Sequence, residues 1–356
     1  MLFIFLVLLS AFAVAAIITG SVRAFVLSRP PAVGASSLFD IPNHRSAHIN
    51  PTPRGGGVGI VIAFLLAAGW LTFTQTLPLL TILGLVGSSF IVALVGFLDD
   101  WKTLLSARYR LAVHFFAAAI FLLAVGGIPA FVAFGLVVNL GWAGNILAAV
   151  YLVWLVNLFN FMDGIDGIAS VEAITVSLSG ALLWWLTTGS DSWMIAAVLA
   201  AAVAGFLCWN HPPAKIFMGD AGSCFLGFTL GALALWSGIE SQPLFWSWSI
   251  LLGCFVVDAT TTLVRRVIRG ERFDEAHRSH VYQYAARKFK SHKRVTYCYG
   301  LVNILWLLPV ATLVALRYLD GVQGLLIAYL PLVLLALKLK AGAPEVAEIQ
   351  ASPRNL

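Results

Sequence analysis

The feature that most constrains this chain is a succession of long apolar runs, repeated from the N-terminus almost to the C-terminus. A run of about 20 apolar residues is long enough to cross a bilayer as a helix. Sixty per cent of the 356 residues are hydrophobic and only 11% are charged, a composition unlike that of soluble domains. The sequence therefore predicts an all-α, polytopic integral membrane protein.

Runs of roughly 17–22 apolar residues predict about eleven transmembrane helices. The first, "MLFIFLVLLSAFAVAAIITG", lacks a positively charged start, which favours a retained span over the alternative of a cleaved signal peptide. Residues 127–142 are apolar but broken by Gly and Pro, which indicates a small β-hairpin or a re-entrant segment on the outer side. The expected spans are 3–20, 58–74, 79–98, 110–126, 143–160, 167–188, 193–209, 223–238, 243–264, 296–316 and 321–339.

The basic residues predict the orientation of these spans. One alternate set of connections, together with the C-terminal tail, holds 21 of the 22 Lys and Arg residues, and the opposite set holds Arg317 alone. Such asymmetry marks cytoplasmic loops and places the N-terminus outside and the C-terminus inside. The net charge of +6 therefore records orientation, and no nucleic-acid partner is expected. We expect one transmembrane domain, 1–340, a cytoplasmic tail, 341–356, and cytoplasmic loops at 21–57, 99–110, 161–166, 210–222 and 265–295.

Five carboxylates fall at predicted cytoplasmic helix ends, in a chain that has sixteen acids in all. Asp99 and Asp100 lie in "GFLDDWK", Asp163 and Asp166 in "NLFNFMDGIDG", and Asp220 in "FMGDAGS". Like charges gathered in one place raise one another's pKa unless a cation compensates them. Oxygen ligands with loose spacing suit Mg²⁺ or Mn²⁺ and not zinc.

The motif "NLFNFMDGIDG" adds a geometric argument. Its polar residues Asn157, Asn160, Asp163 and Asp166 recur every three positions, which places them along one stripe of a helix end. Helix capping is the alternative, and it accounts for one or two of the four. The stripe therefore favours a ligand site.

Two glycine-containing turns suggest contacts with anions. In "FMGDAGS", the turn before a helix exposes backbone N–H groups, and Phe217 offers an aromatic face to a base or serves as an interfacial aromatic. In "PRGGGVG", Arg54, Gly55 and Gly56 form either a backbone-lined anion site or a hinge. We favour the anion site, and assign Gly59 to helix packing.

Carboxylates, arginines and a glycine-rich turn at one membrane face favour phosphoryl transfer, which depends on positioning and charge neutralisation. An ion-coupled secondary transporter is the alternative from another class. Transporter sites lie near the bilayer midplane between inverted repeats. The acids of this chain gather at one predicted mouth and no inverted repeat is visible, so the enzyme is favoured.

Four motifs, in this order and spacing, carry a family resemblance: "GFLDD", "NLFNFMDGIDG", "FMGDAGSCFLG" and "HRSHVYQ". Over about residues 40–290 the chain resembles the polyprenyl-phosphate N-acetylhexosamine-1-phosphate transferases, glycosyltransferase family 4. The resemblance implies a bacterial cytoplasmic (inner) membrane enzyme. Its partners would be undecaprenyl phosphate, a UDP-N-acetylhexosamine and membrane lipid, its cofactor Mg²⁺, and its products undecaprenyl-diphospho-sugar and UMP. The resemblance leaves open whether the enzyme forms a homodimer.

The resemblance also implies residue roles. Asp220 and Asn160 match metal ligands, while Asp163, Asp166 and Phe217 match nucleotide contacts, with Phe217 stacking on uracil. The acidic pair Asp99 and Asp100 matches the catalytic carboxylates beside the lipid phosphate, where Asp99 either positions or deprotonates that group. The groups implied for phosphate and sugar binding are Arg108, His277, Arg278 and His280.

Two stretches separate this chain from the peptidoglycan branch of the family. That branch carries consecutive histidines where this chain has "HRSHVYQ", and it differs from "PNHRSAHINPTPRGGG" at Pro42–Gly57. Both stretches resemble the O-antigen branch, whose members use UDP-N-acetylfucosamine, N-acetylquinovosamine or N-acetylglucosamine. An O-antigen or related surface-polysaccharide role is expected, with the hexosamine left open and transfer of phospho-N-acetylmuramoyl-pentapeptide as the alternative.

Overall fold

The computed structural model describes residues 2–28, 38–40, 51–74, 77–102, 106–272 and 277–343. Most of the expected tail 341–356 and of the segment 42–57, together with parts of the loops 99–110 and 265–295, lie outside the described residues. The strands are β1 (Phe39–Asp40), β2 (Thr52–Pro53), β3 (Phe131–Ala133) and β4 (Leu136–Val138). The helices are α1 (Leu2–Leu27), α2 (Val58–Phe73), α3 (Leu79–Lys102), α4 (Ala107–Ala124), α5 (Trp142–Met162), α6 (Ile168–Thr188), α7 (Trp193–Asn210), α8 (Asp220–Glu240), α9 (Gln242–Leu251), α10 (Gly253–Ile268), α11 (Val281–Phe289), α12 (His292–Val302), the π-helix η1 (Asn303–Leu307), α13 (Leu308–Ala315) and α14 (Gly321–Lys338).

The prediction of an all-α polytopic membrane protein is confirmed. Among the described residues, nine helices are long and apolar enough to cross a membrane, or ten if α9 and α10 together form one span. The remaining expected span, 58–74, is the apolar helix α2, which has 16 residues. All eleven expected runs are thus helical, and α12, η1 and α13 together account for one of them.

Helix α8 forms the centre of the bundle. It packs against α3, α5, α6 and α9, and every residue from Ala221 to Ser237 is buried. Close approach to α3 depends on Gly96, where a Cβ atom would lie 2.5 Å from the carbonyl oxygen of Asp220. The first residues of α8 are therefore fixed against the last turns of α3, and this contact sets the position of the acidic motifs.

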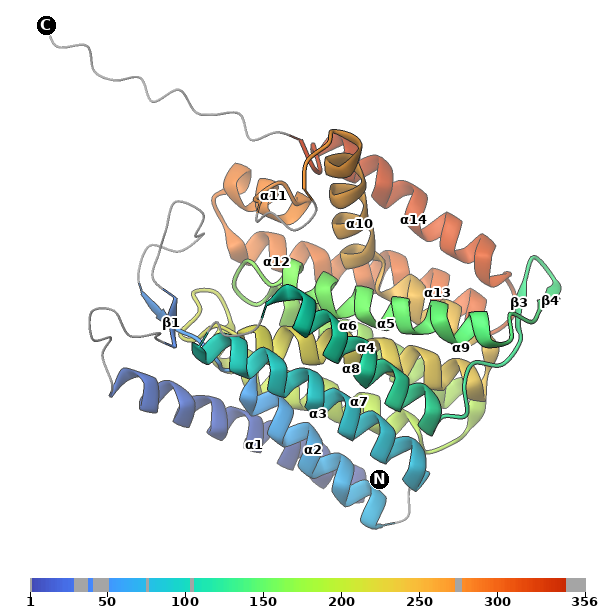
Figure 1. The fold of residues 1–356 in the computed structure, drawn as a ribbon, viewed down its shortest axis with the longest axis horizontal. Coiled ribbons are helices and arrows are strands. Elements are labelled where there is room, and N and C mark those ends of the chain that lie inside the picture. The colour runs from blue at the N-terminus through green and yellow to red at the C-terminus, as the bar shows by residue number, and fades with distance from the viewer. Residues whose placement is uncertain are drawn as a thin grey trace, which may run out of the picture.

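The expected span 243–264 is not one continuous helix. It divides at Leu252 into α9 and α10, whose axes differ by 66°, and α10 stands across the direction of its neighbours in Figure 1. The apolar pattern alone did not reveal this bend. As a consequence, α10 reaches the amphipathic helix α11, against which it packs.

A β-hairpin closes the bundle end opposite β1 (Figure 1). Strands β3 and β4 pair antiparallel, with Ala133 opposite Leu136. The turn residues Phe134 and Gly135 both have positive φ, as a two-residue hairpin turn requires. The hairpin is held to the bundle because Gln242 and Trp246 donate to the Val132 carbonyl oxygen at 2.9 and 3.2 Å. One of the two structures expected for 127–142 is therefore confirmed.

Candidate active site

The acidic motifs of α3 and α8 meet through the side chain of Asp100. Its carboxylate accepts hydrogen bonds from the backbone N–H groups of Asp220, at 3.0 Å, and Ala221, at 3.1 Å. A carboxylate at a helix N-terminus satisfies free N–H groups and complements the helix dipole. Glycine is required at Gly219, since its φ is +79° and a Cβ atom would lie 2.5 Å from Asp100 Oδ2. Asp100 thus fixes where α8 begins.

Two arginines from different segments form ion pairs with these acids. Arg54, before α2, lies 2.9 Å from Asp100 and hydrogen-bonds Asp220. Arg110, in the first turn of α4, hydrogen-bonds Asp99 and lies 3.8 Å from Asp220. Burial alone would lower the pKa of Arg54, but the attraction of Asp220 and Asp100 outweighs burial and raises it. We call Arg54, Asp99, Asp100, Arg110 and Asp220 the ionic cluster.

The two members of the acidic pair have different surroundings. The Asp100 side chain is fully buried, while Asp99 and Asp220 keep 13% and 18% of their side-chain surface exposed. The structure therefore gives Asp100 a positioning task at the start of α8, while the catalytic contact expected of both acids stays a prediction. Asp99 is the member of the pair that a substrate can reach.

The basic residue that completes the cluster differs from the one predicted. Arg108 is exposed, and among the described residues no ion pair is recorded for it, whereas Arg110 pairs with Asp99. Residues two apart on a helix lie about 200° apart around its axis. Arg108 and Arg110 therefore lie on different sides of α4. Their spacing was the signal in the sequence that distinguishes the two arginines.

The glycines after Arg54 pack against the motif that contains Phe217. The N–H groups of Gly56 and Gly57 donate to the carbonyl oxygens of Phe217 and Met218, each at 2.9 Å. A Cβ atom on Gly56 would lie 2.6 Å from Phe206. The predicted cradle of glycine amides is therefore wrong at Gly56, because the amide is already bonded. Gly55, with φ +95°, turns the chain so that Arg54 reaches the cluster.

An apolar groove of about 440 Å³ ends at the ionic cluster. The two asparagines of the predicted stripe line it: Asn157 donates to the Val153 carbonyl oxygen at 2.7 Å, and Asn160 donates to Ser223 Oγ at 3.2 Å. Five helices, α3, α4, α5, α8 and α10, form its walls. Its polar end is formed by Arg110, Asn160 and Asp220, and its apolar walls include Leu111, Phe115, Val150, Val153, Trp154 and Leu263.

Asp163 ends α5 beside the ionic cluster. Burial raises its pKa well above the usual range, and although Arg54 opposes this effect, the charges of Asp220, Asp100 and Asp166 add to it. The two arginines therefore do not fully compensate the negative charge at this end of the bundle. Asp163 therefore lies close enough to three of the other four predicted acids, Asp100, Asp166 and Asp220, to be influenced by their charge.

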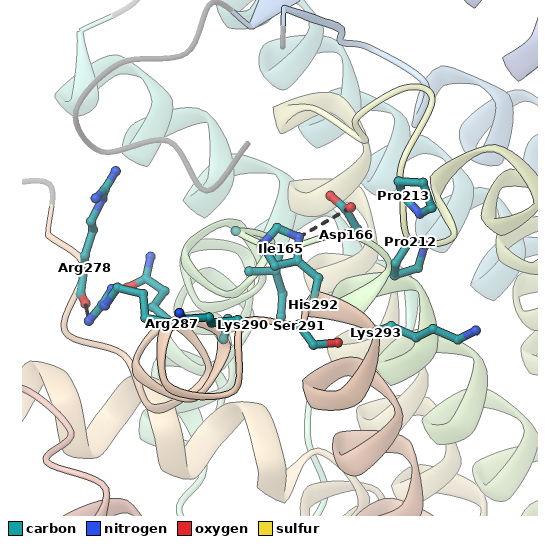
Figure 2. A pocket seen from close by; sticks show the side chains of 13 residues that line it. Ile165, Asp166, Pro212, Pro213, Arg278, Arg287, Lys290, Ser291, His292 and Lys293 are labelled. Atoms are coloured by element: carbon teal, nitrogen blue, oxygen red, sulfur yellow. Dashed lines mark hydrogen bonds and ion pairs between the residues drawn. The ribbon is translucent and has the colours of Figure 1, made fainter. Parts of the chain in front are cut away.

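A second pocket, of about 700 Å³, opens beside Asp166. Figure 2 shows Asp166 joined to His292, whose Nδ1 lies 3.4 Å from its carboxylate, and Asp166 also accepts from the Ala214 N–H at 3.1 Å. The opposite wall is strongly basic. We call this space the basic pocket; it is lined by Gly164, Ile165, Asp166, Pro212, Pro213, Arg278, Gln283, Ala286, Arg287, Lys290, Ser291, His292 and Lys293.

The basic wall is positioned by Asp258 of α10. Its carboxylate accepts from the N–H groups of Val281, at 2.9 Å, and Tyr282, at 3.1 Å, and from Tyr299 Oη at 2.8 Å. These bonds satisfy the N-terminus of α11, as a capping carboxylate does. Tyr282 in turn donates to the Phe161 carbonyl oxygen at 2.9 Å, so α11 is tied to the turn that carries Asp163.

Of the three residues predicted in the last loop, Arg278 lines the basic pocket and the two histidines do not. His280 is buried with its Nδ1 3.3 Å from Asp258, and it caps α11. His277 stacks on His280, with ring centroids 4.7 Å apart, and contacts Ser279. His280 thus helps to hold α11, and its phosphate or sugar contact stays a prediction.

Several pocket residues were missed from the sequence, among them Arg287, Lys290, His292 and Lys293. They follow the apolar face of α11, formed by Val281, Tyr282, Ala285 and Ala286. A run of basic residues on a cytoplasmic loop is normally attributed to membrane orientation. The amphipathic spacing of 281–293 was the available signal that one side of this run faces a cavity.

The donor chemistry of the groove end fits a hard divalent cation. Among the described residues, no three His, Cys, Asp or Glu side chains converge as a ready metal site, because arginines hold the carboxylates. Asp220 and Asn160 both line the groove end. Since the Asn160 amide nitrogen donates to Ser223, its carbonyl oxygen is left for a cation. Carboxylate and carbonyl oxygens are the ligands that Mg²⁺ and Mn²⁺ prefer.

Comparison with known proteins agrees with this geometry. The model of glycosyl transferase family 4 matches residues 82–238, which include α5, most of α3 and α8, and the three motifs that carry all five acids. The chain is 29% identical over 275 residues to a probable undecaprenyl-phosphate N-acetylglucosaminyl 1-phosphate transferase of Bacillus subtilis (strain 168), covering 74% of each chain. It is 26% identical over 243 residues to a phospho-N-acetylmuramoyl-pentapeptide-transferase of Streptococcus pyogenes serotype M3, covering 62% of this chain and 71% of that protein. Residues 82–238 thus match glycosyl transferase family 4, and both relatives support a place for the chain among the polyprenyl-phosphate N-acetylhexosamine-1-phosphate transferases.

Proposed function

We propose that this protein transfers an N-acetylhexosamine-1-phosphate from a UDP-sugar to undecaprenyl phosphate and releases UMP. The observation that carries the proposal is the junction at Asp220, where an apolar groove between membrane helices ends on a charged cluster. A ligand that fits both parts has a long hydrocarbon chain and an anionic head. A polyprenyl phosphate has this chemistry.

The basic pocket supports the second substrate. Arg278, Arg287, Lys290 and Lys293 line the same cavity as Asp166, and its volume of about 700 Å³ is typical of small-molecule sites. Cationic side chains suit a diphosphate, and a carboxylate suits the donors of a base or sugar. A nucleoside diphosphate sugar meets both requirements. Phe217, which is half-buried beside the Arg54 turn, is retained as the proposed stacking partner of the uracil.

In the proposed reaction, an oxygen of the lipid phosphate attacks the β-phosphorus of the UDP-sugar. The bond from that phosphorus to the oxygen bridging the two phosphates breaks, and UMP leaves. Because a phosphate monoester is largely ionised at neutral pH, Asp99 needs only to position the nucleophile together with Arg110. Mg²⁺ held by Asp220 and Asn160 would neutralise charge on the diphosphate.

The proposed setting is the cytoplasmic face of a bacterial inner membrane, in O-antigen or related surface-polysaccharide synthesis. The "HRSHVYQ" loop and the similarity to the Bacillus subtilis relative support a UDP-N-acetylhexosamine. The similarity to the Streptococcus pyogenes relative makes UDP-N-acetylmuramoyl-pentapeptide the second substrate to test.

The purified protein, incubated with undecaprenyl phosphate, Mg²⁺ and each UDP-sugar separately, tests the proposal by mass spectrometry of the lipid product. We expect undecaprenyl-diphospho-N-acetylhexosamine and an equal amount of UMP with at least one hexosamine, and none with EDTA. Asp220→Asn should lower turnover by about 10³-fold, as expected for loss of a charge-stabilising group. Asp191→Asn, an exposed acid on a different loop, is the matched control. Wild-type turnover by Asp220→Asn, or product with the pentapeptide substrate alone, would contradict the proposal.

A further inference from the structure

A histidine lies inside the groove with its polar atoms unused. His114 of α4 is 4% exposed and lines the groove. Among the described residues, neither of its ring nitrogens has a hydrogen-bond partner. Buried polar groups without partners are rare in native proteins, and an ionisable side chain within a transmembrane helix is costly unless it has a task.

The position of His114 relates it to the ionic cluster. It lies four residues after Arg110, which places both side chains on one face of α4, one turn apart. Both line the groove, together with Asp220 at its polar end. Most of the other residues that line the groove, such as Leu111, Phe115 and Val150, are apolar. His114 thus places a polar donor one helical turn from Arg110, among mainly apolar groove residues.

Packing does not account for this residue. A leucine or phenylalanine would fill the same space without leaving two buried nitrogens unsatisfied, and such replacements are neutral or stabilising when both polar partners are absent. A neutral imidazole carries one N–H donor in either tautomer. This N–H lies near an arginine and among apolar residues. An oxygen of an anionic head group is the acceptor that would suit it.

We propose that His114 is a phosphate-binding residue whose ring N–H donates to an oxygen of the phosphate at the head of the lipid substrate, beside Arg110. This inference rests on the proposed function. His114 would donate to the phosphate from the membrane side, whereas Arg110 would approach the phosphate from the side of the ionic cluster. The phosphate would then be held at the boundary between the groove and the cluster, with the hydrocarbon chain along α5.

Binding measured by native mass spectrometry of the detergent-purified protein tests the proposal without requiring turnover. The ligands are undecaprenyl phosphate, undecaprenol and inorganic phosphate, and the variants are His114→Leu, His114→Gln and the control Phe116→Leu. Phe116 is on the same helix and is 60% exposed. We expect His114→Leu to bind undecaprenyl phosphate about tenfold more weakly, the effect of losing a hydrogen bond to a charged group. His114→Gln, which keeps a donor, should bind within about threefold of wild type.

Undecaprenol should bind wild type and His114→Leu equally, and the unfolding midpoint of His114→Leu should not fall. Equal binding of undecaprenyl phosphate by wild type and His114→Leu would overturn the inference and leave the proposed function intact. Equal weakening of undecaprenol would overturn it too, since the histidine would then shape the groove. Binding of inorganic phosphate with the same dependence on His114 would overturn the assignment to the lipid. If wild type binds no undecaprenyl phosphate, the proposed function fails and the inference falls with it.

Discussion

The ionic cluster and the basic pocket lie at the same end of the bundle but are built in opposite ways. The cluster stands on the ends of α3, α4 and α8, where glycines permit backbone contact and two arginines already hold three carboxylates. The basic pocket is formed by the short helix α11 and the turns around it. Its wall carries several Lys and Arg side chains but one carboxylate, that of Asp166. In the cluster, two arginines face three carboxylates with which they form ion pairs, whereas the pocket carries excess positive charge.

This difference assigns different tasks to the two regions. A cluster fixed by helix contacts and ion pairs holds reacting groups in one geometry, which is what transfer chemistry requires. A pocket with excess positive charge attracts an anionic substrate and tolerates changes in its shape. Changes in the cluster should therefore act mainly on turnover, and changes in the pocket mainly on affinity for the UDP-sugar.

After Asp220, the largest effect is expected at Arg110. Its replacement in Arg110→Ala leaves Asp99 without its guanidinium partner and removes positive charge from the groove end. We expect kcat to fall by about 100-fold, the usual cost of removing a charge-stabilising donor, with little change in KM for the UDP-sugar. Initial rates of UMP release at varied UDP-sugar measure both constants.

Arg108→Ala is the matched control for Arg110→Ala. It removes the same group two residues earlier, from the exposed face of α4, and should change kcat less than twofold. Equal losses in the two variants would show that the general charge of this loop matters rather than the contact with Asp99, and the contrast between cluster and pocket would lose its basis.

The sequence was sufficient to predict the parts of the fold that depend on composition. Apolar runs identified the helices, and the acids at their ends identified the side of the bundle where the site lies. It did not predict the bend at Leu252, because both halves of the run are apolar. Bends of this kind arise from packing against neighbours, which no local pattern records.

Within the site, residue type was more predictable than residue task. Asp100 and His280 have the chemistry of catalytic groups, yet both serve as caps, of α8 and α11. Which carboxylate or imidazole points toward solvent depends on helix rotation and on contacts from distant segments. Asp258 illustrates the reverse case: an acid inside an apolar run proved to hold the basic wall in place.

A smaller effect is expected in the basic pocket. Arg287→Ala removes one of several cations along the wall, so the others retain part of the attraction for the diphosphate. We expect KM for the UDP-sugar to rise about fivefold at low salt, less at high salt because exposed charges are screened, with kcat nearly unchanged. Steady-state kinetics at two ionic strengths provides the measurement.

Lys288→Ala is the matched control for Arg287→Ala, since Lys288 is adjacent, equally basic and outside the pocket lining. It should leave both constants near their wild-type values. A fall in kcat for Arg287→Ala as large as that for Arg110→Ala would place the pocket within the reacting centre and erase the proposed division of tasks.

The smallest effect concerns stability, at Asp163 between the two regions. Its pKa is raised in the folded protein, by burial and by nearby acids. The folded protein therefore favours the protonated form of Asp163. The free energy of unfolding falls as the pH rises from the ordinary carboxyl pKa to the raised value, because the buried carboxyl group must then ionise. Asp163→Asn removes this cost. In detergent with EDTA, the variant should unfold several degrees above wild type at pH 8 and together with it near pH 4, where both side chains are neutral. Equal midpoints at pH 8 would mean that Arg54 and Arg110 compensate Asp163 fully, and that the uncompensated negative charge lies elsewhere.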